Sequence, residues 1–179
     1  MKTFIVNLFG GPCAGKSTIA AGIFYELKCL GIDSELVTEV SKDEIWNGSA
    51  ELLNNQPYIF GNQLHRIWRL NNKVNVIVCD SPILLSIVYS KENSENFNNH
   101  IIESHNKFNN LNFLIKRGTH KFTGMGRVHN EQESIQKDEE IKNLLDKNNI
   151  KHLIIEGIDS HDIVRKIVQE VRCCLLYNE

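Results

Sequence analysis

Residues 10–18 combine glycines, a lysine and a serine at a spacing that suits the binding of phosphate groups. The stretch fits the pattern G-x-x-x-x-G-K-[ST] with Gly10, Gly15, Lys16 and Ser17. Glycine lets the backbone wrap closely around phosphate oxygens, and the N–H groups at the start of a following helix converge on an anion. A nucleotide is therefore the predicted ligand. The alternative, a Gly-rich turn before an ordinary helix, is disfavoured because an apolar run, 3–9, precedes the loop and a helical pattern follows it.

Within this loop, Lys16 is expected to reach the β- and γ-phosphates of ATP, and the Ser17 hydroxyl is expected to contact Mg²⁺. ATP and Mg²⁺ are therefore the predicted cofactors. Cys13 stands at a variable position of the pattern and receives no catalytic role. Contacts with the nucleotide are predicted for Gly10, Gly11, Pro12, Cys13, Ala14, Gly15, Lys16, Ser17 and Thr18.

An aspartate, Asp80, closes the apolar run 74–79, which is typical of a buried strand. A carboxylate at the carboxyl end of a strand beside the phosphate loop can hold Mg²⁺ directly or through water. Ser17 and Asp80 are therefore the predicted metal ligands, and Asp80 is also a candidate catalytic residue. In the alternative interpretation, Asp80 only caps a helix that begins at Pro82.

Polar residues for a second substrate are predicted after the second strand, 33–38, and on a helix at 58–70. Glu39 follows that strand, where a carboxylate could orient or deprotonate an acceptor hydroxyl, unless it is only a turn residue. The sequence leaves open whether Asp80 or Glu39 is the base. The helix offers either a pocket for a polar acceptor or a solvated face, formed by Gln63, Arg66 and Arg69. Three aromatic residues are expected in the core more than on a ligand ring: Trp46, Tyr58 and Phe60.

No acidic residue lies between Glu103 and Glu131, although this window holds several lysines, arginines and histidines. A basic, glycine-containing segment in a nucleotide-binding protein is a candidate lid over the phosphates, and we place it at 116–130. Arg127 follows G-M-G and is the first candidate for stabilising a transferred phosphoryl group, with Arg117 the second. The alternative is a solvated loop with an accidental charge bias.

Apolar runs alternate with helical patterns along the chain, which is typical of an α/β fold with a parallel sheet covered on both faces. We expect one domain, 1–179, because no linker or internal repeat divides it. The five expected strands are 3–9, 33–38, 74–79, 111–115 and 151–155. Apolar residues expected on inner helix faces are Ile19, Ile23, Leu27, Leu30, Ile141, Leu144, Leu145, Ile163, Ile167, Val168, Val171 and Leu175. The acidic run 138–140 is expected to form a solvated face.

Composition is ordinary for a soluble globular protein, with 41% hydrophobic and 23% charged residues and a net charge of −2. This charge argues against strong nonspecific binding to nucleic acids. No apolar run is long enough to span a membrane. Five cysteines without metal-type spacing indicate reduced thiols, so a cytoplasmic location is predicted. The oligomeric state, monomer or dimer, is left open.

Several stretches together resemble small P-loop kinases of the nucleoside and nucleotide kinase superfamily. They are GGPCAGKST from Gly10, VTEVSKD from Val37, YIFGNQL from Tyr58, DSPILLS from Asp80 and GMGR from Gly124. The chain is most similar to short phage-type proteins described as AAA-domain ATPases or kinases. That group resembles the kinase domains of NadR-type nicotinamide riboside kinases and the phage kinases that phosphorylate 5-hydroxymethyluracil in DNA.

The resemblance implies a P-loop NTPase fold with a small lid, and a location in the host cytoplasm if a phage encodes the chain. It implies that Lys16, Ser17 and Asp80 serve ATP and magnesium. Glu39 would lie on the acceptor side and Arg127 in the lid. One departure is Val40, because the group often has an aromatic residue at this position, directly after the glutamate. If that aromatic residue touches the acceptor, the specificity of this chain differs.

The predicted function is transfer of the γ-phosphate of ATP to a hydroxyl or phosphate of a nucleoside- or nucleotide-like acceptor. One alternative is the same transfer to a 5-hydroxymethyl-pyrimidine in DNA, which would make DNA a substrate. Another is a nucleotide-dependent switch or ATPase that has no phosphoryl acceptor. The switch is disfavoured because residues 116–119, after the fourth strand, lack the N-K-x-D type of guanine-reading motif.

Overall fold

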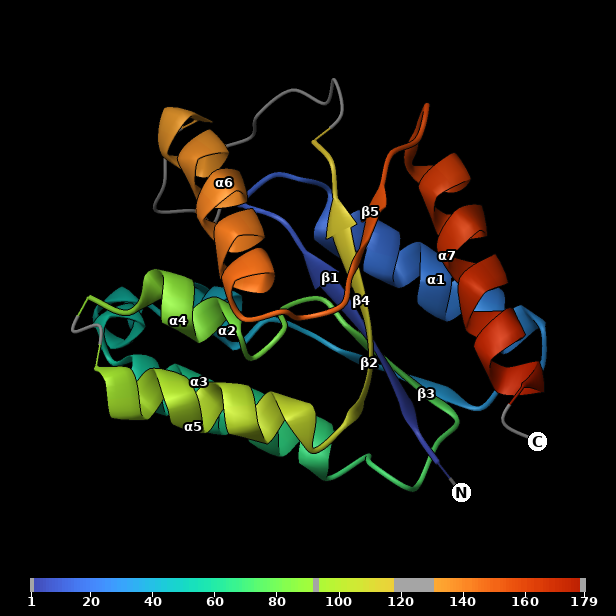
Figure 1. Ribbon diagram of the computed structural model, residues 1–179, viewed down its shortest axis with the longest axis horizontal. Coiled ribbons are helices and arrows are strands. Elements are labelled where there is room, and N and C mark those ends of the chain that lie inside the picture. The colour runs from blue at the N-terminus through green and yellow to red at the C-terminus, as the bar shows by residue number, and fades with distance from the viewer. Residues whose placement is uncertain (1, 92–93, 118–130, 178–179) are drawn as a thin grey trace.

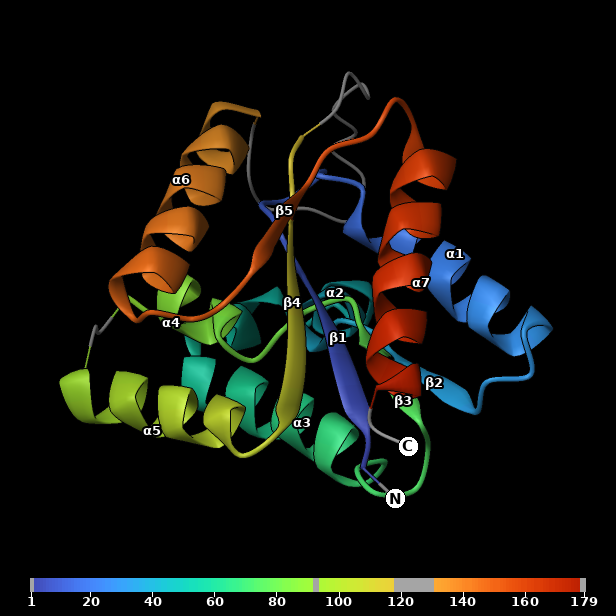
Figure 2. The same ribbon diagram turned by 45° about the vertical axis from the view of Figure 1, so that its right-hand side comes forward.

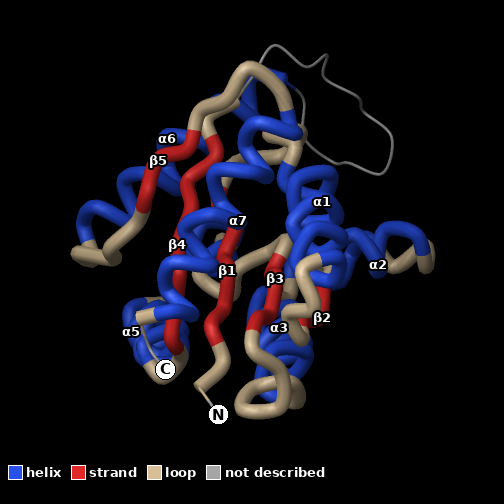
Figure 3. The backbone as a smooth tube through the Cα atoms, turned by 90° about the vertical axis from the view of Figure 1, so that its right-hand side faces the viewer, coloured by secondary structure: helices blue, strands red, loops and turns tan. Residues whose placement is uncertain are grey.

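Five parallel strands form one sheet in the order β2-β3-β1-β4-β5. The computed structural model describes residues 2–91, 94–117 and 131–177. The strands are β1 (Phe4–Phe9), β2 (Ser34–Val37), β3 (Val76–Cys79), β4 (Asn109–Ile115) and β5 (Leu153–Ile155). Figure 3 shows them side by side in this order, and the arrow of β4 in Figure 1 points to their carboxyl ends at the top. The predicted parallel sheet and its strand positions are confirmed.

Helices cover both faces of the sheet (Figures 1 and 2). One face carries α1 (Lys16–Cys29) and α7 (Ser160–Leu176). The other carries α3 (Gln56–Trp68), α4 (Leu85–Tyr89), α5 (Glu95–Asn106) and α6 (Glu131–Lys147). Beside α3 lie α2 (Val40–Trp46) and the short 3₁₀ helix η1 (Ala50–Asn54). Among the described helices, none has the length and apolar character needed to cross a bilayer.

The central strand β1 is buried on both faces, as a strand in a doubly covered parallel sheet must be. Ile5 and Phe9 belong to the core beneath α3, α4, α5 and α6, while Val6 and Leu8 belong to the core beneath α1 and α7. Asn7 interrupts this apolar strand and is only 2% exposed. Its amide donates to Asn110 Oδ1 and Asn112 Oδ1 on β4, at 2.9 and 3.0 Å. The polar side chain is therefore satisfied and ties β1 to its neighbour.

Two expectations about apolar side chains are wrong. Leu30 was expected on the inner face of the first helix, but α1 ends at Cys29 and Leu30 is 45% exposed. Of the three aromatic residues expected in the core, only Phe60 is buried, whereas Trp46 is 65% exposed and Tyr58 37%. The Tyr58 hydroxyl donates to Glu44 Oε1 at 2.8 Å, which fits a side chain that keeps its polar end near water.

Folding stability should depend on pH through His105, which lies near the end of α5. Burial lowers the pKa of this imidazole to about 4 from its ordinary 6.5. The unfolded chain therefore binds more protons than the folded chain between those values. We expect stability from this group to be complete above about pH 6.5 and to fall by about 3 kcal/mol as the pH approaches about 4. Urea unfolding across this range measures the loss.

The His105→Leu variant is the control for this prediction, because it removes the titrating ring and leaves every carboxylate in place. Its free energy of unfolding should fall less steeply than that of the wild type over the same pH range. Parallel curves for the two proteins would contradict the assignment to His105.

Candidate active site

The β1–α1 loop turns sharply at the carboxyl end of β1. Gly10, Cys13 and Gly15 have φ angles of 149°, 62° and 88°, and Gly15 directly precedes the first residue of α1. Left-handed residues in such a turn let successive backbone N–H groups converge on an anion. Cys13 accepts this conformation although it carries a Cβ, which costs about 1 kcal/mol. The φ angles of this turn are therefore compatible with phosphate binding.

Lys16 lies over the start of this loop. Its ammonium donates to the backbone oxygens of Gly10 at 2.7 Å and Gly11 at 3.0 Å. Ser17 and Thr18, in the first turn of α1, are exposed. The cation and both hydroxyls thus lie at the N-terminus of a helix, where a negatively charged ligand is stabilised.

Asp80 directly follows the neighbouring strand β3, at the same edge of the sheet. Cys79 pairs with Asn7 of β1 and with Val37 of β2, so Asp80 immediately follows the paired part of β3. It is 5% exposed, and its Oδ1 atom has no hydrogen-bond partner among the described residues. A buried carboxylate oxygen without a partner is costly and suits a divalent cation. Asp80 and the Ser17 hydroxyl therefore fit Mg²⁺ as its protein ligands.

The capping role considered for Asp80 is not found. The helix after Pro82 is shorter than expected, because α4 begins at Leu85 and Leu84 occupies its N-cap position. That helix has no side-chain hydrogen bond at its N-terminus.

Cys79, the residue before Asp80, is buried, and burial raises the pKa of its thiol to about 12. The thiol therefore stays protonated and is no nucleophile at neutral pH.

The turn between β2 and α2 places Glu39 at the carboxyl edge, next to the end of β3. Gln63 fixes this turn from α3: its Oε1 accepts from Val40 N at 3.1 Å, and its Nε2 donates to Thr38 O at 3.2 Å. Arg66 donates to Thr38 Oγ1 at 3.2 Å and to Asp43 Oδ2 at 2.7 Å. Both side chains therefore hold the segment that carries Glu39.

Arg69 lies elsewhere. It follows the last residue of α3, on the path into β3, and is exposed. Because α3 leads to the beginning of a parallel strand, Arg69 lies toward the amino edge of the sheet. The structure brings Gln63 and Arg66 to the Glu39 turn but does not bring Arg69 there.

A contact between α6 and the phosphate loop was not predicted. Asp138 Oδ1 accepts from Gly11 N at 2.5 Å, and Asp138 Oδ2 accepts from Arg117 Nε at 2.9 Å. Arg117 Nη2 donates to Pro12 O at 3.0 Å and to Ser134 Oγ at 2.7 Å. The expectation of a solvated face at 138–140 is therefore wrong for Asp138. Figures 1 and 2 show the loop after β1 running toward α6.

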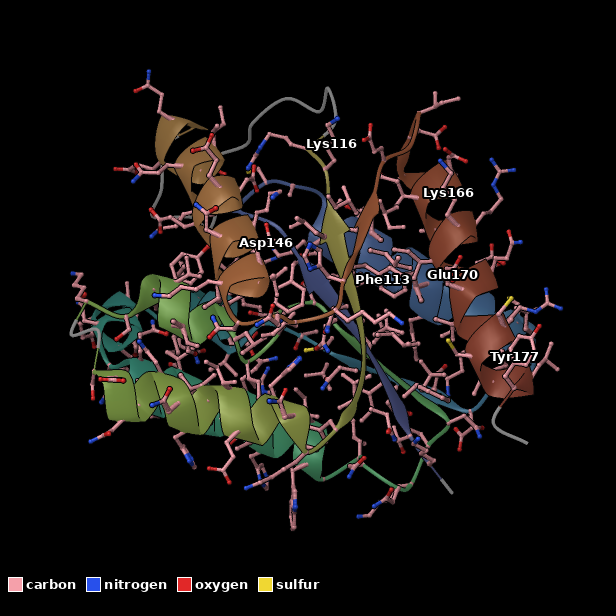
Figure 4. The ribbon with its side chains drawn as sticks, in the orientation of Figure 1. Phe113, Lys116, Asp146, Lys166, Glu170 and Tyr177 are labelled. Carbon is pink, nitrogen blue, oxygen red and sulfur yellow. The ribbon has the colours of Figure 1, made fainter. Side chains whose placement is uncertain are left out.

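The lysines and the arginine of the acid-free window 104–130 that the structure describes each form an ion pair with an acidic residue outside that window. Lys107 contacts Glu103 at 3.0 Å, Lys116 contacts Glu156 at 3.1 Å, and Arg117 contacts Asp138 at 2.9 Å. Figure 4 shows Lys116 at the carboxyl end of β4. The rest of the predicted lid, including Arg127, lies outside the described residues.

The sequence did contain a signal for the α6 contact. Ser134, Asp138, Ile141 and Leu145 recur at the spacing of one helix face, and the last two are fully buried as predicted. The polar pair continues that buried face toward the N-terminus of α6, where it meets the loop. A second signal is Gly11, which the loop pattern does not require to be glycine.

Comparison with known proteins agrees with this geometry. Residues 5–162 match the model of a family described as AAA domain. No curated protein matches the sequence. A solved deoxyadenosine kinase from M. mycoides with dCMP and a flexible dCDP bound is 16% identical, with a TM-score of 0.61 over 96% of this chain and 100% of that one.

A second solved structure is shikimate kinase from Acinetobacter baumannii in complex with shikimate. It is 11% identical, with a TM-score of 0.50 over 100% of this chain and 96% of that one. At such low identities the likeness establishes the fold alone. That fold is a P-loop kinase-like α/β fold, as the sequence predicted.

Replacing Asp80 with asparagine should separate stability from metal binding. Asp80→Asn removes the charge of a buried carboxylate whose Oδ1 atom has no hydrogen-bond partner among the described residues. We therefore expect the free energy of unfolding without ligand to rise by about 1 kcal/mol. Mg²⁺ should no longer strengthen ATP binding to this variant. Denaturant unfolding and calorimetric ATP titrations with and without Mg²⁺ measure the two effects.

The exposed Asp33 provides the control, since Asp33→Asn should change neither quantity measurably. If Asp80→Asn bound Mg²⁺ and ATP as the wild type does, Asp80 would not be a metal ligand.

The Glu39 turn should depend on the amide of Gln63. Gln63→Leu leaves the buried Val40 N–H without its acceptor, so we expect a loss of about 1–3 kcal/mol in the free energy of unfolding. Arg69→Ala, at the residue that directly follows α3, should change the free energy of unfolding by less than about 0.5 kcal/mol. Urea denaturation measures both. Equal effects would mean that the turn is held by something other than the amide.

Proposed function

Because the chain belongs to the AAA domain family of P-loop proteins, we propose that it transfers the γ-phosphate of ATP to a hydroxyl or phosphate of a nucleoside- or nucleotide-like acceptor. The observation that carries the proposal is the meeting of two groups at one sheet edge. Lys16 lies over the phosphate loop, and the buried carboxylate of Asp80 lies at the end of the adjacent strand. Phosphoryl transfer requires a cation for the phosphates and a carboxylate for the metal.

In this proposal, different groups of the site bind the phosphates and the metal ion. The backbone N–H groups at the start of α1 bind phosphate oxygens, and the Lys16 ammonium holds the β- and γ-phosphates in place. The Ser17 hydroxyl and the Asp80 carboxylate hold Mg²⁺. Mg²⁺, when bound, neutralises negative charge on the phosphates that are being separated.

Glu39 is the proposed acceptor-side group. It lies at the carboxyl end of β2, and the turn that carries it is fixed by Gln63 and Arg66. In this position its carboxylate would hydrogen-bond the acceptor hydroxyl or take its proton. Gln63 and Arg66 then serve the acceptor by fixing Glu39, because the amide of Gln63 is already engaged with the backbone.

The fold is compatible with more than one class of acceptor. A deoxyadenosine kinase with bound dCMP and a shikimate kinase with bound shikimate both have it. A nucleoside-type acceptor is favoured here because the deoxyadenosine kinase has the higher TM-score and is covered along its whole length. Arg127 and Arg117 remain the proposed arginines for the transferred group.

The test is incubation with Mg²⁺ and γ-labelled ATP across a panel of acceptors. The panel comprises nucleosides, nucleoside monophosphates, nicotinamide riboside, shikimate, and DNA with and without 5-hydroxymethyluracil. We expect label on one free nucleoside or nucleotide. We also expect Lys16→Ala to lower the rate at least about 100-fold, because it removes the cation over the phosphates.

Lys28→Ala is the matched control, since Lys28 lies on the same helix and pairs with Asp33 and Glu35 on the surface. It should leave the rate unchanged. Label on modified DNA alone would favour the DNA kinase. Binding of ATP without transfer to any acceptor would favour a nucleotide-dependent switch.

A further inference from the structure

Three parts of the chain meet at the start of the phosphate loop. Gly11 and Pro12 belong to the loop, Arg117 follows β4, and Asp138 belongs to α6. Gly11 and Asp138 are 127 residues apart in the sequence, yet Gly11 N and Asp138 Oδ1 are 2.5 Å apart. The tertiary fold alone creates this contact.

Both oxygens of the Asp138 carboxylate are engaged. Oδ1 accepts the Gly11 N–H, and Oδ2 accepts from Arg117 Nε at 2.9 Å. The side chains of Arg117 and Asp138 are only 21% and 25% exposed, so solvent screens the pair less than it screens a surface ion pair. Charge-assisted hydrogen bonds of this kind are stronger than neutral ones.

Arg117 extends the contact to the next loop residue. Its Nη2 donates to Pro12 O, Ser134 O and Ser134 Oγ at 3.0, 3.3 and 2.7 Å. The Ser134 hydroxyl also contacts Pro12 O, and Ser134 is fully buried. The guanidinium therefore has a fixed place beside the loop.

Gly11 is shaped for this contact. A Cβ atom at this position would lie 2.5 Å from Ser134 O and 2.8 Å from Asp138 Oδ1, both too close for a real side chain. Its φ angle is not among the left-handed ones, so backbone conformation does not demand glycine here. Glycine is therefore needed at position 11 because α6 approaches the loop too closely for a Cβ atom.

We propose that Asp138 is a positioning residue, which holds the start of the phosphate loop and the Arg117 guanidinium in the arrangement that binds the phosphates of Mg²⁺-ATP. This inference rests on the proposed function and adds α6 to the nucleotide site. Asp138 acts through the loop and through Arg117, and it need not touch the nucleotide.

The opposite role would be a carboxylate that competes with phosphate for the loop. The position of Asp138 favours a role in supporting the loop over a role in competing with phosphate for it. The N–H that Asp138 accepts belongs to Gly11, at the start of the loop, and not to the helix N-terminus at Lys16, where an anion is expected. The carboxylate also binds Arg117, and so it lowers the cost of keeping that cation beside the loop.

The test is a double-mutant cycle on Asp138→Ala and Arg117→Ala in the full chain, with the dissociation constant of Mg²⁺-ATP measured by calorimetry. Each single variant should weaken binding about tenfold or more, because each breaks charge-assisted hydrogen bonds. The double variant should be no more than about twofold weaker than either, since the two residues act as a unit. Asp138→Asn keeps an acceptor for Gly11 and should be intermediate.

Asp146→Ala is the matched control on α6. Asp146 pairs with Lys142 at 2.6 Å, and Figure 4 shows it near the end of the helix that is far from the loop. The ATP affinity of the Asp146→Ala variant should match that of the wild type. Gly11→Ala, which displaces α6 without removing a polar side chain, should weaken binding as Asp138→Ala does. It is the second variant if Asp138→Ala fails to fold.

Unchanged or tighter ATP binding in Asp138→Ala, or additive effects in the cycle, would overturn the inference. Phosphoryl transfer is measured separately with the acceptor panel. A wild type that binds ATP but transfers no label would refute the proposed function and leave the binding cycle interpretable.

Discussion

The backbone of residues 10–15 makes a tight turn between the carboxyl end of β1 and the start of α1. The neighbouring elements supply the hydrogen bonds that hold this turn. The carbonyl oxygens of such a tight turn need hydrogen-bond donors. Lys16 supplies donors to Gly10 O and Gly11 O, and Arg117 and Ser134 supply them to Pro12 O. The loop is therefore held by α1 from one side and by α6 from the other.

The sheet order determines which charges reach the loop. β1 lies between β3 and β4, so groups at the ends of those two strands are its nearest neighbours. The carboxylate of Asp80 directly follows β3, and the guanidinium of Arg117 follows shortly after β4. With Asp80 as the proposed metal ligand on one side and Arg117 as the proposed phosphate-binding cation on the other, this arrangement matches the division of charge that phosphoryl transfer uses.

Buried amides keep β1 and β4 in register. Asn7 donates to Asn110 and Asn112, and Asn112 donates to Lys151 O at 2.9 Å. A satisfied polar network in a core disfavours slipped pairings, because a slip would leave amides buried without partners. Phe9 pairs with Leu114, so the end of β4 has a fixed distance to the loop that follows Phe9. The position of Arg117 beside the loop depends on this register.

The sequence by itself determined the features that are local. The spacing of Gly10, Gly15, Lys16 and Ser17 defines the loop, and apolar runs that end in acidic residues define strands with carboxylates at one edge. These features were predictable because a motif or a strand end depends on residues that are adjacent along the chain. The parallel α/β fold was predictable because apolar runs typical of buried strands alternate with helical patterns along the chain.

Only the tertiary structure decided what the polar side chains touch. Asp138 lies in an acidic run that is typical of a solvated face, and the amide of Gln63 could equally have faced a ligand. In the fold, Asp138 reaches Gly11 and Gln63 reaches the turn at Val40. A helical period says which side chains share a face, but not which distant segment covers that face. For this reason the partner of each polar group is fixed only when the elements pack.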